Sequence, residues 1–155
     1  MAAVTTVAGR VPEAPHINTR TGSRSQKVIL VVAGLVVVGI GGAVLTTPDT
    51  FHAGNGIDFA GNSSLLSEIR AAGGALLATG ILVTLGAFVR RLTFAAALIG
   101  ATVYLAYGLS RLLSIALDGM PATGLIAAAV AELVLGAACG HVLYRNRRAG
   151  ASPAP

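Results

Sequence analysis

The sequence contains few charged residues and few chemically reactive ones. Charged residues make up 11% of the 155-residue chain, against about 25% in a typical soluble domain, so the chain could not cover a soluble surface. Its single cysteine, Cys139, excludes an internal disulfide and a cysteine metal site. We expect Cys139 to be a small packing residue. The histidines His16, His52 and His141 are too scattered to predict a metal site.

Apolar residues are abundant instead, at 54% of the chain with a mean hydropathy of +0.77. They form four long stretches, and a helix that spans a bilayer needs about 20 such residues. The expected spans are residues 28–47, 67–89, 92–117 and 121–144. The sequence therefore predicts an all-α polytopic membrane protein, an antiparallel bundle of four transmembrane helices.

The spans form one predicted transmembrane domain at residues 27–146. Residues 1–26 are polar, and we expect them to be a disordered cytoplasmic tail. Residues 147–155 are expected to be a second, short cytoplasmic tail. The apolar run after the first tail is longer than the 7–15 residues or so of a signal-peptide core, which favours an uncleaved span.

The connections between the spans are short, except for the first. Pro48 ends the first span, a glycine-containing loop follows, and Ser63 or Ser64 is expected to cap the second helix. Little more than Arg90–Arg91 separates the second span from the third. The segment Asp118-Gly119-Met120-Pro121 has the chemistry of a turn and of a helix start. Short links of this kind make neighbouring helices antiparallel.

The basic residues predict the orientation, because cytoplasmic loops carry an excess of Lys and Arg. If the N-terminus is cytoplasmic, only Arg70 and Arg111 lie in the outer half. The other nine basic residues are then cytoplasmic: Arg10, Arg20, Arg24, Lys27, Arg90, Arg91, Arg145, Arg147 and Arg148. We expect a multi-pass protein of the cell (cytoplasmic) membrane with both termini cytoplasmic. The preference for Arg, with much Ala, Gly and Val, suggests a GC-rich bacterial genome and hence a bacterial inner membrane.

The net charge of +5 does not predict a nucleic-acid partner, because the basic residues sit in short clusters beside the spans. Two ionisable residues inside the spans are more informative, since a charge within a bilayer is costly. Counted from the turn between the last two spans, Arg111 lies about 9 Å back along one helix and Glu132 about 16 Å along the next. An arginine side chain can bridge that offset, so we expect the two residues to pair.

Other polar residues share the outer half of the predicted bundle. Tyr104, Tyr107 and Arg111 follow helical spacing on one face of the third span. In the last span, Gly136 and Gly140 are spaced for close helix packing. The sequence predicts an outer-facing polar pocket formed by Glu68, Arg70, Tyr104, Tyr107, Arg111 and Glu132.

Two functions fit this pocket. The Arg–Glu pair can be a structural clamp, which predicts a non-enzymatic scaffold or accessory protein. Alternatively, the pocket can serve a small carrier or sensor of protons or of a small polar ligand. No nucleophile–histidine–acid set can be assigned, so we expect neither an enzyme nor a cofactor. The expected partners are the lipid bilayer and either a second copy of the chain or another membrane protein.

Several motifs resemble a known family. Residues 68–74 match the E-x-R-A-x-G-G start of one helix in a bacterial four-helix membrane family, domain of unknown function 4345. Residues 108–121 resemble its G-x-x-R…S…D-G-x-P hairpin, and Glu132 stands where its last helix tends to carry an acid. The resemblance covers about residues 28–145 and implies fold and membrane location, because the family has no established activity. The absence of tryptophan and of paired cysteines or histidines disfavours membrane subunits linked to thiol or quinone oxidation.

Overall fold

The computed structural model describes residues 19–150, and in this part of the chain every regular element is a helix. The elements are α1 (Thr19–Thr46), α2 (Pro48–Ala53), α3 (Ser63–Gly86), η1 (Arg90–Leu92), α4 (Thr93–Asp118) and α5 (Thr123–Gly150). Four of them are long and apolar enough to cross a membrane. The prediction of an all-α chain with four such helices is confirmed.

Three helix boundaries differ from those we predicted. Helix α1 begins at Thr19, inside the segment predicted as the first tail, and α5 continues to Gly150. The predicted bounds are those of the apolar stretches, because they rest on hydropathy. The backbone hydrogen bonds of a helix can continue into the polar sequence beyond such a stretch. Helix α3 begins at Ser63 instead of residue 67. The remainder of the predicted tails, residues 1–18 and 151–155, lies outside the described residues.

The loop after α1 is more ordered than its composition suggested. Pro48 begins the short helix α2, at the helix start where its missing N–H costs nothing. The expected cap of α3 at Ser63 or Ser64 is wrong, because Asn62 takes this position. The Asn62 Oδ1 accepts a hydrogen bond of 3.1 Å from the Leu65 backbone N–H. Phe59 is buried although the loop around it is exposed.

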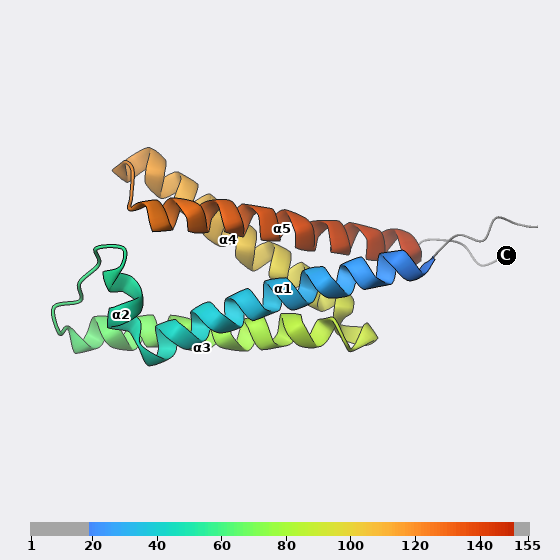
Figure 1. The fold of residues 1–155 in the computed structure, drawn as a ribbon, viewed down its shortest axis with the longest axis horizontal. Helices are drawn as coiled ribbons and strands as arrows, with labels where there is room; N and C mark the ends of the chain where they lie inside the picture. Colours follow the sequence, from blue (N-terminus) through green and yellow to red (C-terminus); the bar gives the residue numbers. More distant parts are fainter. Residues whose placement is uncertain (1–18, 151–155) are drawn as a thin grey trace, which may run out of the picture.

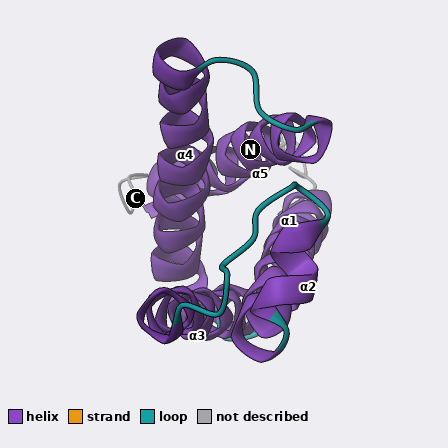
Figure 2. Cartoon of the chain, turned by 90° about the vertical axis from the view of Figure 1, so that its left-hand side faces the viewer, coloured by secondary structure: helices purple, strands orange, loops and turns teal. Residues whose placement is uncertain are grey.

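The long helices form two antiparallel pairs, α1 with α3 and α4 with α5 (Figure 1). The start of α1, the end of α3, the start of α4 and the end of α5 lie together, and we call this the terminal end of the molecule (Figure 1). Helix α2 and the α4–α5 turn lie at the opposite end, the loop end. Figure 2 views the molecule from the loop end, where the segment after α2 crosses over to α3.

The α1–α3 pair is held by glycines spaced seven residues apart on both helices, Gly34 and Gly41 on α1 and Gly73 and Gly80 on α3. A Cβ added to Gly41 would lie 2.8 Å from the Gly73 carbonyl oxygen. One added to Gly80 would lie 2.6 Å from the Val38 backbone nitrogen. Backbone therefore packs directly on backbone, which small residues at a helix interface permit. We refer to these four residues as the glycine seam.

The α4–α5 pair packs differently, with a leucine of each helix above a glycine of the other. Leu133 covers Gly108, and Leu105 covers Gly136; in each case an added Cβ would lie 2.8 Å from the leucine side chain. The prediction that Gly140 also packs closely is wrong, because nothing lies within 4 Å of its Cβ position. Gly140 lies one turn after Gly136, beyond the reach of the Leu105 side chain.

The core lies at the terminal end, where the two pairs meet through small residues. Ala33, Ala97 and Cys139 are fully buried there. The Cys139 Sγ lies 3.0 Å from the position that a Cβ would take on Gly100, so this thiol fills space left by a missing side chain. Towards the loop end the pairs diverge (Figure 1).

Candidate functional site

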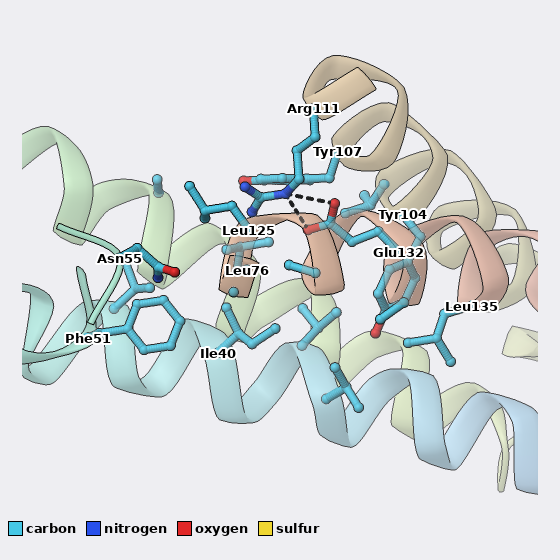
Figure 3. Close-up of a pocket in the computed structure, with 18 of the residues that line it drawn as sticks. Ile40, Phe51, Asn55, Leu76, Tyr104, Tyr107, Arg111, Leu125, Glu132 and Leu135 are labelled. Atoms are coloured by element: carbon cyan, nitrogen blue, oxygen red, sulfur yellow. Dashed lines mark hydrogen bonds and ion pairs between the residues drawn. The ribbon is translucent and has the colours of Figure 1, made fainter. Parts of the chain in front are cut away.

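A cavity of about 360 Å³ lies between the two helix pairs in the half of the molecule that carries the loop end. Figure 3 shows side chains that converge on it from every long helix and from α2. The lining of the cavity is mostly apolar and includes Ile40, Val44, Leu76, Leu125 and Leu135. This volume is within the usual range of small-molecule pockets, roughly 300–1,000 Å³.

The wall of the cavity carries one ion pair, between Arg111 of α4 and Glu132 of α5. The Arg111 Nε–H is shared between both carboxylate oxygens of Glu132, at 2.9 Å and 3.1 Å. The carboxylate side chain is 12% exposed and the arginine side chain 31% exposed. The residues that we expected to pair are therefore in contact, because the helices are adjacent and the offset along them is short.

The pair leaves most of the arginine's hydrogen-bonding capacity unused. A guanidinium group has five N–H donors, and only the Nε–H bonds to Glu132. The terminal nitrogens point away from Glu132, towards the side of Leu125 and Asn55 (Figure 3). Among the residues that the structure describes, no side chain or carbonyl accepts from them.

The two tyrosines of the predicted pocket have different surroundings. Tyr104 is 4% exposed, and its hydroxyl donates a 2.7 Å hydrogen bond to the Ala33 carbonyl oxygen of α1. It forms the inner limit of the cavity and ties α4 to α1. Tyr107 is 40% exposed and lies one turn before Arg111, beside the guanidinium group (Figure 3).

The prediction that Glu68 and Arg70 belong to this pocket is wrong. Both are exposed, and neither lines the cavity. The face of α3 that reaches the cavity is formed by Ile69, Ala72 and Leu76. Successive helical residues are rotated by about 100°, so a helix that turns Ile69 inward turns both of its charged neighbours outward.

Sequence reasoning missed the cavity residues contributed by α1 and by the loop. Phe51 and Asn55 cover the loop end of the cavity (Figure 3). The Asn55 Oδ1 is 2.5 Å from the position of a Cβ on Gly124, so the loop rests directly on the start of α5. The apolar residues Phe51, Ile57 and Phe59 in an otherwise polar loop were the available signal that it packs on the helices.

The fold and the site together indicate a multi-pass helical membrane protein with an apolar cavity between two helix pairs. The chain belongs to the family described as domain of unknown function (DUF4345), whose model matches residues 25–143. This match confirms the resemblance drawn from the motifs at 68–74 and 108–121. Comparison with curated proteins and with solved structures gives no significant match.

Proposed function

We propose that the protein is a non-enzymatic binding protein of a bacterial cytoplasmic membrane, and that it holds a small ligand with an apolar body in the cavity between the helix pairs. The observation that carries this proposal is the cavity itself, which combines an apolar lining with one ion pair on its wall. Pockets that bind small molecules share this composition, in which a few polar groups orient a mostly apolar ligand. A carrier or a sensor could use such a site.

The ligand reaches the cavity from the lipid. Val36, Ile40 and Phe51 line the cavity and are each more than a third exposed. Val36 and Ile40 lie within the first candidate span, where the surroundings of a side chain are acyl chains, so an apolar molecule dissolved in the bilayer meets the cavity without crossing water. Charged substrates from the aqueous phase have no comparable apolar route.

The orientation proposed for the protein has the terminal end on the cytoplasmic side. Seven basic residues fall on the segments gathered there: Arg24, Lys27, Arg90, Arg91, Arg145, Arg147 and Arg148. The loop end instead carries the acids Asp49, Asp58, Glu68 and Asp118. The positive-inside rule supports cytoplasmic termini and a cavity in the outer half.

A reporter enzyme that is active only outside the cell tests this orientation. Fused after Pro155 the reporter should be silent, and inserted between Asn55 and Asn62 it should be active. The reverse pattern would overturn the orientation and place the cavity in the cytoplasmic half.

Occupancy of the cavity can be tested by purification in native lipid followed by mass spectrometry of the molecules that co-purify. We expect a small apolar compound enriched over its share in the bulk membrane. Ala128→Phe should remove it, because Ala128 lines the cavity one turn before Glu132. Ala127→Phe is the matched control, since Ala127 is exposed and outside the cavity lining. Equal enrichment with both variants would exclude the cavity as the site.

The scaffold is the second candidate function, and one observation favours it. Arg111 and Glu132 pair within the chain, so the contact between them joins α4 to α5 directly. Such a protein would act through a second copy or another membrane protein. Purification that recovers a stable protein partner but no enriched small molecule would favour this candidate.

A further inference from the structure

The ion pair on the cavity wall restricts the head group that a ligand can have. The Arg111 Nε lies 2.9 Å from the Glu132 Oε2, and the charges of the two side chains cancel. A second anion beside Arg111 would leave one uncompensated negative charge in an apolar surrounding, which is costly. A neutral group adds no charge and avoids this cost.

The same pair also favours a ligand that carries a hydrogen-bond acceptor. The terminal N–H groups of Arg111 face the side of the cavity near Leu125 and Asn55 and have no protein acceptor among the described residues (Figure 3). The Arg111 side chain is 31% exposed, and donors that face an apolar lining gain free energy when they meet an acceptor there. A carbonyl oxygen can accept two hydrogen bonds from one guanidinium group and remains uncharged.

We propose that the cavity selects an uncharged single-chain amphiphile whose carbonyl oxygen accepts hydrogen bonds from the terminal nitrogens of Arg111. The chain of this ligand lies along the apolar lining between Ile40, Leu76 and Leu125 (Figure 3). Glu132 acts as the selectivity residue, because it neutralises Arg111 and so excludes a carboxylate. This inference rests on the proposed binding function and adds the chemical class of the ligand.

Three probes of equal chain length test the head group: tritiated methyl palmitate, palmitate at pH 8, and hexadecane. Binding to the full-length protein in detergent is measured by scintillation proximity. A hydrogen bond from a charged donor is worth at least one factor of ten in affinity, so we expect methyl palmitate to bind about tenfold more tightly than hexadecane. Palmitate should bind more weakly than methyl palmitate.

Replacing Glu132 should reverse this preference. In Glu132→Gln the arginine loses its counter-ion while the shape of the site is kept, so palmitate should bind more tightly than methyl palmitate. Glu68→Gln is the control, because it removes an acid that is exposed and outside the cavity; it should leave the order of the three probes unchanged.

The outcomes separate the two proposals. If none of the probes binds the wild-type protein, or if Ala128→Phe binds all three as well as the wild type, the proposed binding function fails. If all three bind the wild type equally, the cavity binds ligands but the head-group inference is overturned. Tighter binding of palmitate than of methyl palmitate to the wild type would also overturn it, whether or not Glu132→Gln is stable enough to measure.

Discussion

The terminal half and the loop half of the molecule contain the same helices but pack them in opposite ways. In the terminal half the two helix pairs meet through alanine, glycine and Cys139, and the buried residues described are uncharged. In the loop half the pairs diverge, larger side chains such as Leu76 and Leu125 line a cavity, and the Arg111–Glu132 pair stands on its wall. Small residues let the two pairs close on one another in the terminal half, and the divergence of the pairs leaves room for a site in the loop half.

The boundary between the halves is marked by Tyr104. Its ring is part of the buried core, it also lines the cavity, and its hydroxyl bonds to α1. Among the described residues this is a hydrogen bond that joins the two helix pairs directly. The two pairs are therefore joined at Tyr104, and they diverge beyond it towards the loop end.

The largest expected effect comes from breaking the ion pair in the loop half. Removing one member of a fully buried pair costs about 3–5 kcal/mol in the free energy of unfolding, because the other charge is left unpaired. Arg111 and Glu132 are partly buried, so we expect a loss towards or below the lower end of that range. We expect Arg111→Ala to be more destabilising than Glu132→Ala. Arg111→Ala leaves Glu132 unpaired, and the Glu132 side chain is 12% exposed whereas that of Arg111 is 31% exposed. Thermal unfolding in detergent and abundance in the membrane measure this.

Replacing both members by leucine should recover part of that loss, because no unpaired charge remains. Single substitutions that each leave the melting temperature unchanged would show that the pair contributes nothing to stability. The contrast between the two halves would then be one of shape alone.

An intermediate effect is expected from the glycine seam. Gly73→Ala places a Cβ 2.7 Å from the Leu45 backbone nitrogen, and overpacking of this kind costs about 1–3 kcal/mol. Gly74→Ala is the matched control: nothing lies within 4 Å of its Cβ position, and Ala is preferred over Gly in a helix by about 0.5–1 kcal/mol. The two variants should shift the melting temperature in opposite directions. Shifts of the same sign would contradict the close α1–α3 contact.

The smallest effect is expected at the boundary. Tyr104→Phe removes the hydroxyl that bonds to Ala33, which should cost about 0.5–1.5 kcal/mol in the free energy of unfolding. Tyr107→Phe removes a hydroxyl from a residue that is 40% exposed, so we expect a loss of less than half that size. If Tyr107→Phe were the more destabilising change, Tyr104 would not join the pairs.

Part of the site was predictable because it depends only on distance along neighbouring helices. The four-residue link between the last two spans makes them antiparallel, and the offset between Arg111 and Glu132 follows from the helical rise. The short link at Arg90–Arg91 similarly makes the second and third spans antiparallel neighbours. None of these arguments requires knowledge of how a helix is rotated about its own axis.

The two residues wrongly placed in the cavity share one cause. Glu68 and Arg70 were assigned to the wrong side of a helix, although the helix itself was predicted. In water, an apolar stripe identifies the buried face of a helix. In a bilayer, lipid and protein interior are equally apolar, so no such stripe distinguishes them.

The sequence by itself determined the number, order and apolar character of the four long helices, and the pairing of Arg111 with Glu132. These features follow from local composition and from the length of short links. Only the tertiary structure decided that α1 closes on α3 through glycines, that the two pairs diverge at the loop end, and that Phe51 and Asn55 cover a cavity there. Such features depend on the rotation of each helix against its neighbours, which packing between side chains sets and hydropathy does not record.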